Sequence, residues 1–195
     1  MKVLDRIKAI TINNNIILTS VIGLSGTGKT NFALWLSEKL LNDNLYDDVK
    51  LVNLEENLDE KAIFDSKNTI YIFDDVTYLL SKHSKEIDKF LRALMLARHS
   101  IERAMFIFIS HYSTSTLPVL RSAHVRVVSS ITSVYELRQY AKLFNTDALW
   151  DFYQRFIKLE RYIFLVNALG FHAIIKIPLS NLYKIKFSKI EVLSA

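Results

Sequence analysis

The residues at 23–30, Gly-Leu-Ser-Gly-Thr-Gly-Lys-Thr, fit the pattern G-x-x-x-x-G-K-[ST] and follow the apolar run 15–22. The pattern predicts a phosphate-binding loop, because successive backbone N–H groups and the N-terminus of the following helix form a concave surface of donors. Lys29 is expected to contact the β- and γ-phosphates, and the Thr30 hydroxyl to coordinate Mg²⁺. The expected phosphate-binding residues are Gly23, Ser25, Gly26, Thr27, Gly28, Lys29, Thr30 and Asn31. The structural alternative is a glycine-rich turn before an amphipathic helix.

Two carboxylates, Asp74 and Asp75, directly follow the apolar run 69–73. Beside a phosphate loop, the first acid of such a pair typically holds Mg²⁺, usually through bound water, so we assign that role to Asp74. Asp75 is placed to orient or deprotonate the water that attacks the γ-phosphate, which a kinase does not require. Without the loop upstream, two aspartates after a strand are more often a turn or a helix cap.

These residues require a sheet that brings the loop and the carboxylates to one edge. Apolar runs alternate with amphipathic segments, which predicts a parallel sheet covered by helices, with ligands at the carboxyl ends of its strands. An edge hairpin is expected from a strand at 9–12, a polar turn at 13–15 and a strand at 16–22. Further strands are predicted at 49–54, 69–75, 105–109 and 125–128, with a terminal hairpin formed by 162–167 and 171–177. Helices are predicted at 29–42, 85–99, 134–144 and 146–159.

Composition limits the class of protein. A chain of 195 residues, half of them hydrophobic, is expected to form one domain, with a core at about 9–145 and C-terminal helices and hairpin at about 146–195. The absence of cysteine excludes disulfides and thiolate metal sites. No apolar run approaches the roughly 20 residues of a spanning helix, and no signal peptide is evident, so we expect a cytoplasmic protein without a membrane span. The formal charge of +5 favours an anionic partner such as nucleic acid.

Four segments, 71–76 (Tyr-Ile-Phe-Asp-Asp-Val), 96–99 (Leu-Ala-Arg-His), 105–111 (Met-Phe-Ile-Phe-Ile-Ser-His) and 117–123 (Leu-Pro-Val-Leu-Arg-Ser-Ala), carry a family resemblance. Over about residues 16–145 the sequence resembles the FtsK/HerA superfamily of P-loop translocases, in particular the poxvirus-type genome-packaging ATPases of DNA viruses. The resemblance implies a RecA-like P-loop NTPase, with residues 23–30 as the Walker A motif and the run ending in Asp74 as the Walker B motif.

The resemblance also implies roles for residues outside the two motifs. His111 stands where the family usually has a glutamine sensor; an imidazole can donate one hydrogen bond and accept another, and its charge can change near neutral pH. A polar strand end is the alternative for His111. Arg98 and Arg121 are the candidate arginine fingers, which act on a neighbouring subunit. Arg92, Arg103 and Arg126 stay open, and each arginine could instead form a surface salt bridge.

Two other site classes are less well supported. The five histidines do not have the spacing of zinc ligands. The aromatic residues at 150–156 could stack on bases, as in single-strand binders, but their helical spacing favours a role in the core.

The resulting interpretation is a Mg²⁺-dependent ATPase that translocates double-stranded DNA, with packaging of a viral genome into the capsid as its preferred task. Its expected catalytic residues are Lys29, Asp75, His111, Arg98 and Arg121, with Thr30 and Asp74 as the Mg²⁺ residues. The family implies a homo-oligomeric ring, a hexamer or pentamer, with a capsid or portal-vertex protein as a further partner and a cytoplasmic or virion-associated location. The alternatives are another motor of the same family, serving secretion, virion assembly or conjugation, a small P-loop nucleotide kinase, and a GTPase-like switch.

Overall fold

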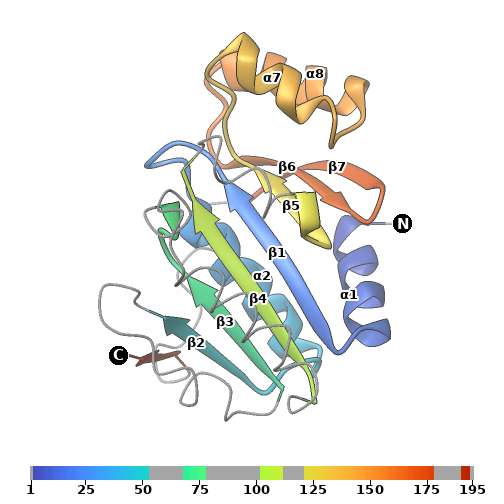
Figure 1. The fold of residues 1–195 in the computed structure, drawn as a ribbon, viewed down its shortest axis with the longest axis vertical. Coiled ribbons are helices and arrows are strands. Elements are labelled where there is room, and N and C mark those ends of the chain that lie inside the picture. Colours follow the sequence, from blue (N-terminus) through green and yellow to red (C-terminus); the bar gives the residue numbers. More distant parts are fainter. Residues whose placement is uncertain (1, 53–67, 78–101, 112–120, 178–189, 194–195) are drawn as a thin grey trace.

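The computed structural model describes residues 2–52, 68–77, 102–111, 121–177 and 190–193, and an eight-stranded sheet forms its centre (Figure 1). The strand order is β7-β6-β5-β1-β4-β3-β2-β8. In chain order the strands are β1 (Ile16–Ile22), β2 (Asp48–Val52), β3 (Thr69–Phe73), β4 (Ala104–Ser110), β5 (Val125–Val128), β6 (Ile163–Ala168), β7 (Phe171–Lys176) and β8 (Ile190–Leu193).

Most of this sheet is parallel. β5, β1, β4, β3, β2 and β8 run in the same direction, and only β6 and β7 are antiparallel to their neighbours. Every residue of β3 and β4 is buried, as expected for parallel strands whose two faces are both covered. The predicted α/β fold with a mostly parallel sheet and a C-terminal β-hairpin is therefore confirmed. The edge strand β8, which pairs with β2, was not predicted.

Helix α2 (Lys29–Asn42) follows β1 and has the predicted bounds. Its buried residues Phe32, Leu36 and Leu40 recur every four positions, so that one helical face packs on the sheet. Phe32 also contacts Phe164 of β6, with ring centroids 5.0 Å apart. Because the last two residues of the glycine-rich loop (residues 23–30) are the first two of α2, the packing of α2 fixes the position of that loop.

The predicted N-terminal edge hairpin is wrong. Residues Val3–Asn13 form helix α1, and β1 lies inside the sheet between β4 and β5. Val3, Ile7 and Ile10 are buried at helical spacing, in the same core cluster as residues of α2 and β6. Burial of this face outweighs the strand preference of the β-branched residues at 10–12, because tertiary packing commonly overrides local propensity.

Helices α7 (Val134–Tyr140) and α8 (Thr146–Ile157) lie together near β5, β6 and β7 (Figure 1). They cover the face of the sheet opposite α1 and α2. Neighbouring residues of β6, whose side chains point to opposite faces, show this: Phe164 packs with α2, and Leu165 packs with α7 and α8. Side chains of Ser133 and Asn145 accept hydrogen bonds from the first turns of α7 and α8, which explains where the helices begin.

Two further expectations concern segments without a description. The predicted helix 85–99 and the end of the predicted strand 49–54 lie outside the described residues. Within the described ranges, each helix is too short or too polar to cross a bilayer.

Candidate functional site

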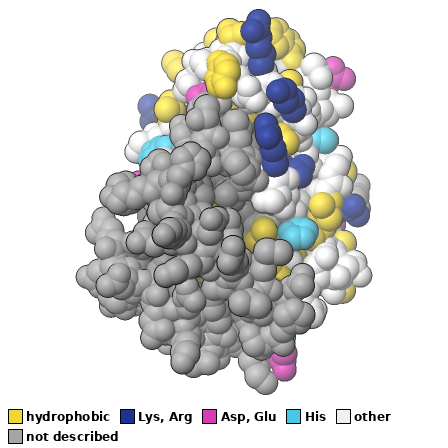
Figure 2. Space-filling model, in the orientation of Figure 1, with side chains coloured by type: hydrophobic (Ala, Val, Ile, Leu, Met, Phe, Trp, Pro, Cys, Tyr) yellow, Lys and Arg dark blue, Asp and Glu magenta, His cyan; other side chains and the backbone are white. Residues whose placement is uncertain are grey.

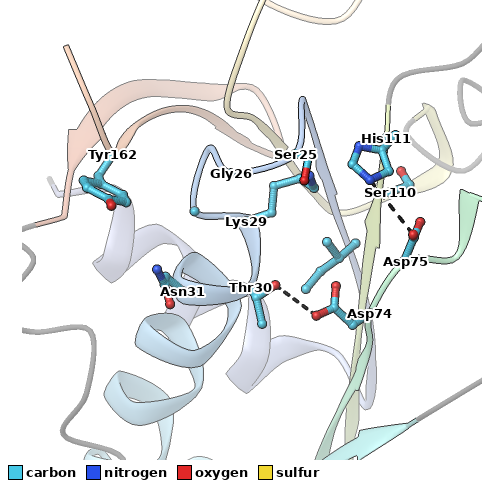
Figure 3. A pocket seen from close by; sticks show the side chains of 12 residues that line it. Ser25, Gly26, Lys29, Thr30, Asn31, Asp74, Asp75, Ser110, His111 and Tyr162 are labelled. Carbon is cyan, nitrogen blue, oxygen red and sulfur yellow. Dashed lines mark hydrogen bonds and ion pairs between the residues drawn. The ribbon is translucent and has the colours of Figure 1, made fainter. Parts of the chain in front are cut away.

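The strand order brings the glycine-rich loop and the two aspartates to one edge of the sheet. β4 lies between β1 and β3, and all three strands are parallel, so their carboxyl ends meet at that edge. The end of β4 is hydrogen-bonded to both neighbours: the Gly23 N–H donates to the Ser110 carbonyl at 3.3 Å, and the Val76 N–H donates to the Ile109 carbonyl at 2.9 Å. A cavity of about 440 Å³ lies at this edge of the sheet. Residues of the loop line it together with Asp74, Asp75, His111 and Tyr162 (Figure 3).

Glycines shape the loop at two positions for different reasons. Gly28, the N-cap of α2, has φ +87°, a conformation that side chains other than glycine rarely adopt. At Gly23 the reason is close approach, since a Cβ atom there would lie 2.0 Å from the Ser129 Oγ atom. Any other residue would be strained at Gly28 and would crowd Ser129 at Gly23, so glycine suits the path of the loop at both positions.

Lys29 turns back toward the loop that precedes it. Its Nζ atom donates to the Gly23 carbonyl at 3.0 Å and to the Leu24 carbonyl at 2.8 Å, and the residue is only 8% exposed. Burial lowers the pKa of Lys29 from its usual value, while the negative charges of Asp74 and Asp75 oppose that shift. An ammonium group has three N–H donors, so two bonds to the loop leave one for a ligand.

Thr30 and Asp74 face each other across the cavity edge. The Thr30 hydroxyl donates to the Asp74 Oδ2 atom at 2.9 Å. These are hard oxygen donors, which suit Mg²⁺, and no group of three or more His, Cys, Asp or Glu suited to a metal occurs among the described residues. A sparse donor set fits Mg²⁺, because this ion keeps several waters and is completed by substrate phosphates. Thr30 and Asp74 therefore fit the predicted metal role.

Asp75 and His111 form a second pair in the cavity. The His111 Nε2 atom lies 4.0 Å from the Asp75 Oδ2 atom, an ion pair when the imidazole is protonated. Asp75 has φ +51°, a left-handed conformation that aspartate tolerates better than most residues and that often occurs at functional sites. The His111 N–H donates to the Thr77 hydroxyl at 2.7 Å, which ties the end of β4 to the turn after β3.

Two serines at the end of β5 hold the loop from behind, and sequence reasoning missed them. The Ser130 hydroxyl accepts from the Leu24 N–H at 2.8 Å, and the hydroxyl oxygens of Ser129 and Thr27 lie 2.6 Å apart. The only sequence signal was their position after a predicted parallel strand, where polar residues commonly reach the ligand edge.

Tyr162 is a third residue that the sequence did not indicate. It comes just before β6 yet lines the same cavity as the loop. A Cβ atom at Gly28 would lie 2.8 Å from the Tyr162 Cδ1 atom, so the ring packs directly on the loop backbone. No local motif marks this contact, which forms only because the antiparallel strands join the sheet beside β5.

Among the described residues, the candidate arginines Arg103, Arg121 and Arg126 do not line this cavity. Arg98 and Arg92 lie outside the described residues. Arg121 is exposed just before β5, where its carbonyl accepts from the Arg126 guanidinium at 2.7 Å. Arg103 precedes β4, at the opposite sheet edge, and its guanidinium is 3.5 Å from the Leu45 carbonyl.

The aromatic residues of α8 have mixed roles. Phe152 is buried in the core, as predicted, whereas Trp150 is exposed. Tyr153 and Phe156 are partly buried against the same core cluster. The expectation that helical spacing places these aromatic residues in the core is therefore wrong for Trp150.

Strand order, glycine-rich loop and strand-end aspartates together define a P-loop NTPase fold, and comparison with known proteins agrees. No family model and no curated protein matches the sequence. Among solved structures, the chain is similar to the genome packaging NTPase B204 from Sulfolobus turreted icosahedral virus 2 in complex with sulfate, with a TM-score of 0.63 and 15% identity over 85% of this chain and 98% of that chain. The complex of the same protein with AMPPCP gives a TM-score of 0.60 and 15% identity over 84% and 98%.

B204, the DNA-packaging ATPase from Sulfolobus turreted icosahedral virus, gives a TM-score of 0.56 and 16% identity over 85% of this chain and all of that chain, 100%. The resemblance to viral genome-packaging ATPases that the sequence indicates is thus confirmed at the level of the fold.

Proposed function

We propose that this chain is a Mg²⁺-dependent ATPase that translocates double-stranded DNA, and that its task is to package a viral genome. The observation that carries the proposal is the single cavity that joins the glycine-rich loop to Asp74 and Asp75. The structural neighbours are described as packaging NTPases, and one of them was solved with the nucleotide analogue AMPPCP.

The loop binds the phosphates. Backbone N–H groups of residues 25–31 surround the β-phosphate, and Lys29 contacts the β- and γ-phosphates through the donor that the loop carbonyls leave over. Thr30 and Asp74 would hold Mg²⁺, which would supply positive charge to offset the negative charge on the phosphate oxygens.

Asp75 is the residue for the attacking water. Its side chain lines the cavity and is 64% exposed, so a water molecule can reach the carboxylate, which accepts a proton from the water or orients it for attack. His111, 4.0 Å from Asp75, acts as the sensor: it contacts the γ-phosphate, and a change in that contact shifts the end of β4, which His111 directly follows. An acid in this position favours hydrolysis. A kinase, by contrast, transfers the γ-phosphate to a second substrate and does not require such an acid.

Electrostatics support a polyanionic partner. The chain carries a net charge of +5, and the described part of the face in Figure 2 shows Lys and Arg more prominently than Asp and Glu. Sequence-independent contacts between basic side chains and DNA phosphates suit a motor that must move along any sequence.

The motor works as a homo-oligomeric ring, a hexamer or pentamer, in which an arginine from a neighbouring subunit completes each site. Arg121 is exposed and does not line the cavity at the loop, which suits a residue that reaches another subunit, and Arg98 is the alternative finger. A capsid or portal-vertex protein is the further partner of the ring.

The test is ATP hydrolysis by the purified chain with and without duplex DNA, combined with light scattering to size the assembly. We expect turnover without any phosphoryl acceptor, stimulation by duplex DNA and a ring-sized particle. Turnover that appears only when a nucleoside or nucleotide acceptor is added would identify a kinase and contradict the proposal.

A further inference from the structure

A second cavity adjoins the first, and Tyr162 belongs to both. This cavity, of about 600 Å³, lies between the glycine-rich loop and the segment that leads from α8 to β6. The two cavities share Gly26 and Tyr162 as lining residues. A ligand bound at the loop can therefore extend past Tyr162 into the second cavity.

Part of the lining of the second cavity is apolar and aromatic, contributed by Phe156, Leu159 and Tyr162. Polar side chains, Thr132, Glu160 and Arg161 among them, also line this cavity. Leu159 is 84% exposed, which is unusual for a leucine beside a cavity, and a ligand there would cover it. Leu159 and Tyr162 have φ values of +59° and +57°, left-handed conformations that cost energy in residues other than glycine, asparagine and aspartate. These conformations set the course of the turn that carries the Tyr162 ring to the loop.

The direction of a bound triphosphate follows from the placement of the side chains. Figure 3 shows Asp75 and His111 on one side of the loop and Tyr162 on the other, with Asn31 of the first turn of α2 on the Tyr162 side. If the γ-phosphate lies by Asp75, as the proposed function requires, the α-phosphate and the rest of the nucleotide must lie toward Tyr162. The base then enters the second cavity.

We propose that the second cavity is the subsite for the purine base of ATP, with the Tyr162 ring as the surface on which the base packs and Leu159 as an apolar contact. This inference rests on the proposed function and deepens it. The Tyr162 ring is itself supported by the backbone of Gly28, so the same loop that binds the phosphates fixes the surface for the base. Base and phosphates are thereby held in one rigid arrangement.

The test compares ATP with inorganic tripolyphosphate, which has the phosphates but no base. Tyr162→Ala is expected to weaken ATP binding by about five- to a hundredfold, the range for loss of one base–aromatic contact, and to leave tripolyphosphate binding unchanged. Tyr162→Phe keeps the ring and is expected to bind ATP like the wild type. Both affinities are measured by isothermal titration calorimetry on the full chain.

A second variant and a control make the result specific. Leu159→Asn removes the apolar side chain but suits the left-handed backbone, so it tests the contact without adding strain, and we expect it also to weaken ATP binding alone. Tyr135→Ala removes an aromatic ring that is 53% exposed and lines neither cavity, and it should change nothing.

Each outcome separates the inference from the proposed function. Equal loss of ATP and tripolyphosphate in Tyr162→Ala would make the ring a support for the loop and overturn the subsite. A wild-type protein that binds tripolyphosphate as tightly as ATP would overturn the subsite alone. A wild-type protein that binds neither contradicts the proposed function, and the subsite falls with it.

Discussion

Thr30 and Asp74 are joined by a hydrogen bond of 2.9 Å from the threonine hydroxyl to the carboxylate, although they lie on different elements. Thr30 belongs to the first turn of α2, and Asp74 follows β3, with β4 between β3 and the strand that enters the loop. The bond therefore spans the central strand at the ligand edge. It brings two oxygen donors close to Lys29, an arrangement that suits the Mg²⁺ site proposed above.

Lys29→Ala is expected to weaken ATP binding by about ten- to a hundredfold, because a charge-assisted hydrogen bond contributes about 1.5–3 kcal/mol. Titration calorimetry with ATP measures the change. Lys39→Ala is the matched control, since Lys39 lies in the last turn of the same helix and does not line the cavity. Equal affinity of the two variants for ATP would remove Lys29 from the site.

Asp75→Asn is expected to bind ATP normally and to lose turnover by a factor of about 10²–10⁴, the usual contribution of a general acid–base group. Asparagine tolerates φ near +51° as aspartate does, so the fold should be retained. Steady-state hydrolysis and ATP binding are measured on the same preparation. Unchanged kcat in this variant would refute the role assigned to Asp75.

Gly23→Ala is expected to destabilise the protein by about 1–3 kcal/mol, because the added Cβ atom meets the Ser129 hydroxyl and overpacks the site. Thermal unfolding of Gly23→Ala, Ser129→Ala and the double variant gives the coupling free energy between the positions. We expect Ser129→Ala to relieve part of the cost.

Gly26→Ala serves as the control for this cycle. A Cβ atom at Gly26 has nothing within 4 Å, and its cost arises only from φ +75°, so Ser129→Ala should not relieve it. Additive effects of Gly23→Ala and Ser129→Ala would argue against the close contact.

His124 is expected to make stability depend on pH. Its Nδ1 atom accepts a hydrogen bond from the Leu18 N–H at 3.0 Å, and burial, with a smaller contribution from Arg126, lowers the pKa of its imidazole. The folded protein therefore binds the proton less readily than the unfolded chain. The stabilisation is complete above the unfolded-state pKa of about 6.5 and is lost as pH falls below it.

The measurement is the free energy of unfolding in urea between pH 7.5 and pH 5 for the wild type and His124→Asn. Asparagine can offer an oxygen acceptor to the Leu18 N–H but does not titrate. We expect a smaller loss of stability on acidification in the variant. Parallel curves for the two proteins would show that His124 does not titrate differently in the folded state.

Most of the sheet and α2 could be predicted from sequence because their signals are local. The runs that became β3 and β4 are continuously apolar, and α2 places Phe32, Leu36 and Leu40 on one face. The C-terminal part of α1, residues 9–12, is predicted as a strand because Ile10, Thr11 and Ile12 favour strands locally, whereas the burial of α1 against β6 and β7 is a tertiary effect. The short edge strand β8 has too few residues to show a period.

The residues of the candidate site also fall into two groups, those that a local sequence pattern predicts and those that only the folded structure reveals. A spacing pattern marks the glycine-rich loop, and an apolar run marks Asp74 and Asp75, so both could be found in the sequence. Ser129 and Tyr162 contact the loop across more than a hundred residues of chain, and neither contact leaves a local pattern. Only the assembled sheet, with β5 and β6 beside β1, brings them there.

The serine bonds behind the loop have a mechanical consequence. Ser129 and Ser130 lie in the short link between β5 and α7, and both are bonded to the loop through Thr27 and Leu24. A loop that shifts when nucleotide enters or leaves must either break these bonds or pull the link with it. A movement of the loop would therefore be transmitted to the start of α7 through these two serine hydroxyl groups.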